Sequence, residues 1–454
     1  METDISLRPG VNASPDVRDR VRIGPLPDWV KPCVLDIEFK VEAPSHCTHL
    51  LLCRQIHAET KQTYVHTAAR LETMQSVQHN SQWQLQFEPR TQLVTLHWIR
   101  VHRSGEVRDC ANFEKIRLLQ REAGLERFMI QGWFTILLLL EDVRPGDVVE
   151  TCYTIESQPE ILRDNCTHVF ALPTGVAIGQ FQFSVHHKTD RALKWRSSAP
   201  ELKPEVQCEN GAVIWTWKRE NYQVPEAEIN TPPDWIVFPW IQVSDCADWG
   251  VVADAAARAW SDDRTGPAVE KLMEEITGGE TDLVARASKA IQIVQDDFRY
   301  LNVDLDHGGH VPSAPETVAQ RRYGDCKDLS LLLVRLLKNL QIPARPILVN
   351  NRLGRSVNAM LPMPELFNHA IVEFKLQDTV CWVDPVLKLQ GGNALNRFIP
   401  DYGAGLPVDS AAKALSEPPR CGNKAAIYEL TESILLDSTG ALSPLSGQYP
   451  PRRF

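Results

Sequence analysis

The chain has 454 residues, with 48 Lys or Arg against 58 Asp or Glu, so its formal net charge at pH 7 is −10. A chain this acidic is a poor candidate for binding nucleic-acid phosphates. Apolar residues make up 43% and charged residues 23%, which excludes disordered, collagen-like and coiled-coil classes. At about 150 residues per domain, the length predicts two to three domains.

The N-terminal segment shows no targeting signal. It carries Glu2 and Asp4 and lacks an apolar core of the secretory type, and no run approaches the roughly 18 apolar residues that span a bilayer. We therefore expect a cytoplasmic protein without a membrane span. The 11 cysteines contain no CxxC pair, so we expect neither a disulfide framework nor a zinc ribbon.

Residues from about 35 to 220 alternate between apolar and polar positions, a pattern typical of strands with one buried face. Turn signals separate the runs, including Pro145-Gly146 at the centre of a predicted type II turn. We predict an antiparallel β-sandwich domain over residues 1–225. The alternating runs are Trp83, Leu85 and Phe87; Val94, Leu96 and Trp98; Phe181, Phe183 and Val185; and Val213, Trp215 and Trp217.

Prolines and tryptophans mark residues 226–250 as a packed, irregular joint between domains. Helical spacing follows: one amphipathic helix begins at Leu283 and ends near Tyr300, and a second begins at Cys326 with Asp325 as its N-cap. Strands are expected at 345–350, 369–375 and 380–384. We assign residues 251–400 to an α+β core, and interpret residues 401–454 as a tail that begins a truncated β domain.

A cysteine in the first turn of the second helix is the strongest candidate for chemistry. Cys326 follows Gly324 in the segment YGDCKD, and the positive end of the helix dipole favours the thiolate, which is the nucleophile. His369 opens one predicted strand and Asp384 ends the next, so a hairpin places them side by side. The chain order is Cys, His, Asp.

These residues resemble the transglutaminase-like superfamily, whose papain-like core carries a helix-borne Cys followed by strand-borne His and Asp. The resemblance covers about 285–390 and rests on YGDCKD, a leucine-rich helix, NHAIVEF and CWVDP. It implies a multidomain α+β fold with Cys326 as nucleophile, His369 as general base and acid, and Asp384 as the residue that orients the imidazole. Residues 141–150 and the joint also resemble a β-rich domain of unknown function that precedes such cores in many bacterial proteins.

The sequence departs from the family pattern in two places. The family commonly has threonine after the proline of the Asp motif, where this chain has Val386. A hydroxyl that supports Asp384 is therefore missing from that position. The family also tends to carry a further C-terminal β domain, of which residues 430–437 read as the first strand.

The resemblance implies acyl transfer on a peptide or carboxamide carbonyl, by a cysteine peptidase, an amidase or a transamidase, with peptide or protein substrates and no cofactor. The oxyanion would be held partly by the backbone N–H of Cys326. The sequence does not separate Gln292, Tyr300 and Asn302 as side-chain donors.

Two alternatives remain open. The first is an inactive peptide- or protein-binding module on the same scaffold, in which the β domain pairs with an extended peptide. The second is a metal-dependent hydrolase that uses Asp304, His307 and His310. The spacing of the two histidines lacks the helical i, i+4 pattern of zinc hydrolases and Gly308-Gly309 indicates a turn, so we favour a polar loop and expect no metal site.

Overall fold

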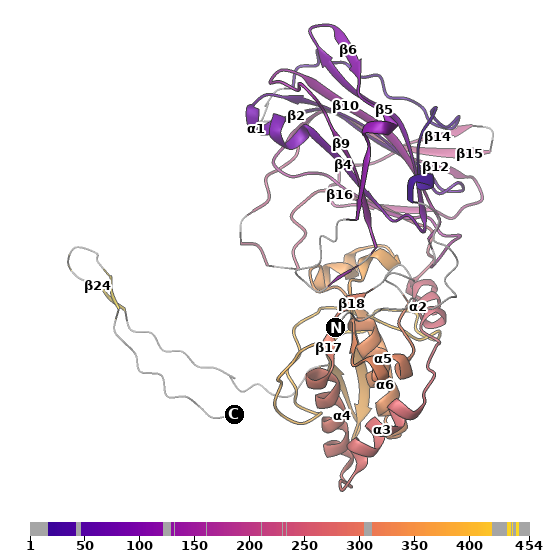
Figure 1. Ribbon diagram of the computed structural model, residues 1–454, viewed down its shortest axis with the longest axis vertical. Helices are drawn as coiled ribbons and strands as arrows, with labels where there is room; N and C mark the ends of the chain where they lie inside the picture. Colours follow the sequence, from indigo (N-terminus) through magenta and orange to yellow (C-terminus); the bar gives the residue numbers. More distant parts are fainter. Residues whose placement is uncertain are drawn as a thin grey trace, which may run out of the picture.

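The computed structural model describes residues 17–41, 47–120, 129–130, 132–159, 161–209, 211–228, 230–232, 234–303, 311–419, 434–436, 438 and 442–444. A β-rich region built from the first half of the chain lies above an α+β region built from the second half (Figure 1). The chain is therefore multidomain, as its sequence predicts. No helix in the described part of the chain is long and apolar enough to cross a membrane.

A nine-stranded sheet dominates the β-rich region. Its strands run in the order β1-β5-β10-β3-β2-β12-β15-β14, with β6 paired to β5. All pairs are antiparallel except β1 with β5 and β2 with β12. The strands are β1 (Val21–Ile23), β2 (Cys47–His57), β3 (Gln62–Leu71), β5 (Gln92–Arg103), β6 (Glu106–Asp109), β10 (Val148–Ser157), β12 (Ala177–Lys188), β14 (Glu205–Glu209) and β15 (Ala212–Gln223).

Two three-stranded sheets pack against the large sheet and complete a sandwich. One contact buries Phe87 and Ile136 against Leu96, and the other stacks Phe170 on Phe183 with ring centroids 5.0 Å apart. Burial of these alternating side chains is the main stabilisation of the region. The small sheets are β4-β9-β7, from β4 (Gln82–Phe87), β7 (Arg117–Gln120) and β9 (Phe134–Leu139), and β11-β16-β13, from β11 (Thr167–Ala171), β13 (Lys194–Ser197) and β16 (Trp240–Ser244).

The predicted alternation on β5 is wrong at Trp98. Tyr153 of β10 pairs with Leu96 and the preceding Cys152 pairs with Trp98, so the register shifts there and no residue of β10 stands opposite His97 in the register. The resulting β-bulge reverses the side-chain alternation. Ile99 therefore continues the face of Leu96, whereas Trp98 packs on the opposite face of the sheet.

The prediction of an irregular joint at 226–250 is also wrong in part. Residues 240–244 form β16, which is the central strand of its small sheet and is buried throughout. Pro239 precedes the strand, so it removes no hydrogen bond from the ladder. The segment thus contributes a strand to the β-rich region before α2 (Trp249–Ala259) begins.

The α+β region packs helices against the sheet β22-β21-β20-β23. The central helix α6 is almost fully buried, because leucines such as Leu332, Leu333 and Leu336 surround most of its circumference. The elements are α3 (Pro267–Thr277), α4 (Leu283–Asp297), α5 (Pro315–Arg321), α6 (Cys326–Asn339), β20 (Ala344–Val349), β21 (His369–Leu376), β22 (Thr379–Val383) and β23 (Gly405–Pro407).

Short pairings join segments that are distant in sequence. β8 (Met129–Ile130) of the β-rich region pairs in parallel with β18 (Asn302–Val303), which belongs to the α+β region. β17 (Arg299–Tyr300) pairs with β19 (Tyr323–Gly324), just before α6. In the tail, β24 (Ile434–Leu436) pairs with β25 (Leu442–Pro444); β24 falls within the strand expected at 430–437, whose other residues lie outside the described part.

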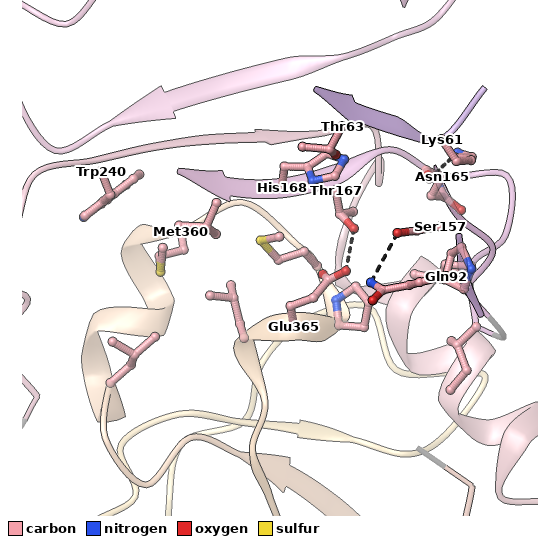
Figure 2. Close-up of a pocket in the computed structure, with 18 of the residues that line it drawn as sticks. Lys61, Thr63, Gln92, Ser157, Asn165, Thr167, His168, Trp240, Met360 and Glu365 are labelled. Atoms are coloured by element: carbon pink, nitrogen blue, oxygen red, sulfur yellow. Dashed lines mark hydrogen bonds between the residues drawn. The ribbon is translucent and has the colours of Figure 1, made fainter. Parts of the chain in front are cut away.

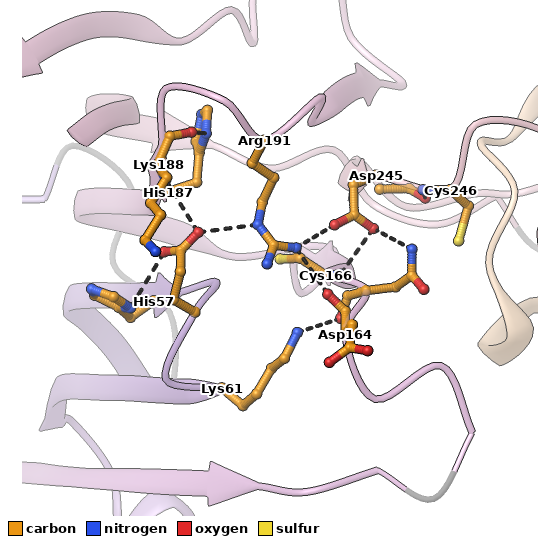
Figure 3. Close-up of polar contacts among 12 residues, drawn as sticks. His57, Lys61, Asp164, Cys166, His187, Lys188, Arg191, Asp245 and Cys246 are labelled. Atoms are coloured by element: carbon orange, nitrogen blue, oxygen red, sulfur yellow. Dashed lines mark hydrogen bonds and ion pairs between the residues drawn. The ribbon is translucent and has the colours of Figure 1, made fainter. Parts of the chain in front are cut away.

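Arg191 joins three segments at the junction between the large sheet and the β11-β16-β13 sheet (Figure 3). Its guanidinium donates to Glu59 at 3.1 Å, to Asp245 after β16, and to the carbonyl of Asp164 at 3.1 Å. Asp245 also accepts the backbone N–H of Cys166 at 3.0 Å. The network therefore fixes the residues just before β11 to the turn that follows β2 and to the end of β16.

Replacing Arg191 with methionine is expected to lower the free energy of unfolding by about 2–3 kcal/mol, because two poorly exposed carboxylates lose their partner. Urea unfolding followed by tryptophan fluorescence measures the change. The control is Arg258→Met, which breaks an exposed helical pair with Asp254 and should cost at most about 0.5 kcal/mol. Equal losses in the two variants would contradict the structural role of Arg191.

Candidate active site

Cys326 is the first residue of α6, as predicted. Asp325 caps the helix by accepting the N–H groups of Lys327 at 3.0 Å and Asp328 at 3.1 Å. Among the described residues, no hydrogen bond uses the backbone N–H of Cys326. Gly324 is required by space, since a Cβ there would lie 2.7 Å from Cβ of Asp328. The thiol and a free backbone donor thus share the positive end of a rigid helix.

The structure brings His369 and Asp384 together on adjacent strands. His369 opens β21 and Asp384 directly follows β22, and the imidazole Nε2 lies 2.8 Å from Oδ2 of Asp384. The Cys326 side chain contributes, together with Asp384, to raising the pKa of His369. Ser330 of α6 donates to the carbonyl of Ala370 at 3.1 Å, which ties the helix to the beginning of β21. The three predicted residues therefore form one cluster.

Asp384 is fully buried, and further donors hold its carboxylate. Oδ2 accepts the hydroxyl of Tyr402 at 2.5 Å, in addition to His369, and Oδ1 accepts the backbone N–H of Val386 at 3.0 Å. Gln295 of α4 donates to the backbone carbonyl of Asp384 at 2.8 Å. The hydroxyl that is absent from position 386 is thus supplied by Tyr402.

The electrostatics of the cluster favour a charged imidazole. Burial opposes the charge, but hydrogen bonds and negative charge from Asp384 and Cys326 outweigh it and raise the pKa of His369 to about 10. His369 is therefore an imidazolium at neutral pH, placed between a carboxylate and a thiol. Such a group can stabilise a thiolate and can donate a proton to a leaving group.

The raised pKa of His369 predicts a pH-dependent stability. A group with a raised pKa stabilises the fold fully below its unfolded value, 6.5, and loses this contribution as the pH rises to about 10. Wild type should lose at most about 5 kcal/mol across this window relative to His369→Gln. Urea unfolding at pH values between 6.5 and 10 measures this loss of unfolding free energy. The control is His79→Gln, a substitution at an exposed histidine. Parallel losses in wild type and His369→Gln would contradict the assignment.

The structure distinguishes the three candidates for a side-chain donor to the oxyanion. Gln292 is exposed on α4. Tyr300 is half-buried, and burial together with the negative charges of Cys326 and Asp325 raises its pKa, so its hydroxyl remains a donor. The side chain of Asn302 lies outside the described part. Among these candidates, Tyr300 is the one that pairs with Gly324, two residues before Cys326.

Asp304, Asp306, His307 and His310 lie outside the described residues, so the structure does not place them. Within the residues that it does describe, no group of three or more His, Cys, Asp or Glu side chains could hold a metal ion. The residues that gather at the helix start are a thiol, an imidazole and a carboxylate.

Tyr402 could not be identified from the sequence, because it lies in an irregular segment and a single buried tyrosine carries no local signal. Replacing it with phenylalanine is expected to cost about 1.5–3 kcal/mol of unfolding free energy, since the buried carboxylate loses a donor. A double-mutant cycle with Asp384→Asn measures the coupling between the two side chains. Additive changes in the free energy of unfolding would show that the Tyr402 hydroxyl does not interact with Asp384.

Comparisons with known proteins divide the chain into two parts. A model of DUF3857, a domain of unknown function with a solved structure, matches residues 57–226, and a model of the transglutaminase-like superfamily matches residues 270–385. The second match contains Cys326, His369 and Asp384. The chain carries a transglutaminase-like domain behind a DUF3857 domain. A search of curated proteins finds no match.

One solved structure shares the overall fold of this chain. A provisionally assigned protease from Parabacteroides distasonis superposes with a TM-score of 0.66 at 11% identity, covering 82% of this chain and 72% of that one. This likeness shows the fold. A provisionally assigned cysteine protease from Cytophaga hutchinsonii covers 49% of this chain and 71% of its own at 14% identity, with a TM-score of 0.23, too low to carry an argument.

Proposed function

We propose that the chain is a thiol acyl-transfer enzyme acting on a peptide or carboxamide carbonyl. Cys326 is the nucleophile, His369 transfers protons, and Asp384 orients the imidazole. The observation that carries the proposal is the buried contact of 2.8 Å between His369 and Asp384, on strands that Ser330 ties to the helix beginning at Cys326. The transglutaminase-like match over these residues supports it.

The reaction proceeds in two halves. The Cys326 thiolate forms an S–C bond to the carbonyl carbon, and the C–N bond breaks as His369 donates a proton to the departing amine. The free N–H of Cys326 and the hydroxyl of Tyr300 are suited to hold the oxyanion. Water or a second amine then gives a proton to His369 and forms a C–O or C–N bond to the acyl carbon, while the S–C bond breaks and the Cys326 thiolate is released. The acceptor therefore distinguishes a peptidase or amidase from a transamidase.

The rate of iodoacetamide labelling tests the nucleophile. Cys326 is expected to label faster than Cys208, an exposed thiol on β14 that serves as internal reference, at pH values well below 8. His369→Ala should remove this advantage and leave Cys208 unchanged. Peptide mass spectrometry reads each site separately. If Cys326 labels no faster than Cys208 in wild type, the enzyme proposal fails and the inactive binding module is favoured.

A further inference from the structure

A cavity of about 530 Å³ lies between the β-rich and α+β regions (Figure 2). Its lining does not include Cys326, His369 or Asp384, so it is separate from the candidate active site. The lining is mainly apolar and comes from both regions of the chain. The floor is formed by Phe238, Trp240, Met360, Met363 and Leu366.

One wall of the cavity carries the edge of a sheet. Thr167, His168 and Val169 of β11 line it, and β11 is an outer strand that pairs with β16 on one side only among the described strands. In an antiparallel pair, the N–H and C=O groups of alternate residues point away from the partner strand. β11 therefore offers unpaired backbone groups of the kind that accept an additional strand.

A carboxylate without a counter-ion lies in the same wall. Glu365 accepts the Thr167 hydroxyl at 2.9 Å and forms no ion pair with any described residue. It is reached by solvent, yet surrounding protein raises its pKa. Burial, with the positive charges of Arg54 and Lys61, lowers the pKa of His168 to about 4, so the neighbouring ring is neutral. No charge from His168 compensates Glu365 at pH 7.

The other charged group of the lining is already engaged. Lys61 donates to the carbonyl of Asn165 at 2.6 Å and forms no ion pair with Glu365, and Figure 2 shows the two side chains apart, with Thr167 between Glu365 and the strands above it. The cavity thus combines an apolar floor, an unpaired strand edge and an uncompensated carboxylate. A strand-like ligand with apolar side chains and one cationic side chain matches all three.

We propose that this cavity binds an extended peptide, which pairs with β11, packs apolar side chains on the floor and places a lysine or arginine beside Glu365. The site goes beyond the proposed acyl transfer and does not depend on it. The cavity is close to the candidate active site along the chain, because Leu366 of its lining lies three residues before His369. Asn350, which directly follows β20, donates to the carbonyl of Leu366 at 2.6 Å.

Fluorescence polarisation on the full chain carrying Cys326→Ala tests the proposal, because this background cannot turn the probe over. The probe is a fluorescein-labelled peptide of alternating valine and lysine, and the same peptide with glutamate in place of lysine is its partner. We expect saturable binding of the lysine peptide and binding about tenfold or more weaker for the glutamate peptide. N-methylation of alternate peptide bonds should abolish binding, because it removes the strand-pairing donors.

Glu365→Gln should weaken the lysine peptide about tenfold, whereas Glu274→Gln, the same change at an exposed position on α3, should have no effect. Leu353→Trp, which adds volume at the half-buried wall, should also reduce binding. If thermal melting shows that Glu365→Gln does not fold, the binding of Leu353→Trp and of the N-methylated peptide still tests the proposed site.

Equal binding of the lysine and glutamate peptides would overturn the proposal, as would unchanged affinity after N-methylation. Since these measurements use the Cys326→Ala background, their failure would leave the acyl-transfer proposal intact. Conversely, slow iodoacetamide labelling of Cys326 would leave the peptide site intact.

Discussion

Replacing Cys326 with alanine is expected to lower the rate of acylation by p-nitrophenyl acetate about 10⁴-fold or more. In wild type, the thiolate forms an S–C bond with the ester carbonyl and p-nitrophenolate leaves, giving a burst stoichiometric with the chain. The variant lacks the nucleophile, while the helix keeps its cap because Asp325 accepts N–H groups beyond position 326. Release of p-nitrophenolate in a stopped-flow absorbance experiment measures the burst.

Cys208→Ala is the matched control, because it removes an exposed cysteine far from α6 in sequence. Its burst should equal that of wild type. A burst that persists in Cys326→Ala and disappears in Cys208→Ala would place the reactive thiol in the β-rich region and refute the proposed function.

Asp384→Asn is expected to slow the same acylation about 10³–10⁴-fold. The two carboxylate oxygens accept three donors, from His369, Tyr402 and the backbone of Val386. An amide replaces one acceptor with an NH₂ group, so at least one of these donors faces another donor. The variant also removes negative charge that raises the pKa of His369.

The pH dependence of Cys326 alkylation in Asp384→Asn separates the two consequences. A fall in the pKa of His369 moves the alkaline limb of the profile to lower pH, whereas a misplaced ring lowers the rate at every pH. Glu373→Gln is a suitable control: Glu373 is a carboxylate of β21 that accepts from Trp382 and Arg345. If Asp384→Asn alkylates at the wild-type rate and pH, Asp384 does not orient His369.

The sequence was informative where the signal was local. The start of α6 at Cys326 could be predicted because an N-cap, a glycine and a leucine-rich run adjoin one another in the chain. The strands that carry His369 and Asp384 were predictable from their apolar runs, and their proximity followed from the hairpin. To predict that Cys326, His369 and Asp384 lie together required these short-range patterns and one assumption, that the hairpin packs against the start of α6.

Features that depend on distant segments were not predictable. The bulge at His97 arises from pairing with β10. The strand β16 follows a proline-rich segment and forms because it pairs with β11 on one side and β13 on the other. The cavity wall joins Thr167 and Glu365, which are 198 residues apart. No periodicity within a short window reports such contacts.

The packing between the two regions limits how the chain can be divided for engineering. Val357, Met360 and Met363 of the α+β region are buried in a cluster that includes Trp240 of β16. Gln242 of β16 also donates to the carbonyl of Leu361 at 2.9 Å. A fragment of the α+β region beginning near residue 251 would present this apolar surface to water, so it would aggregate more readily than the whole chain. The two regions are therefore poor candidates for exchange as independent modules.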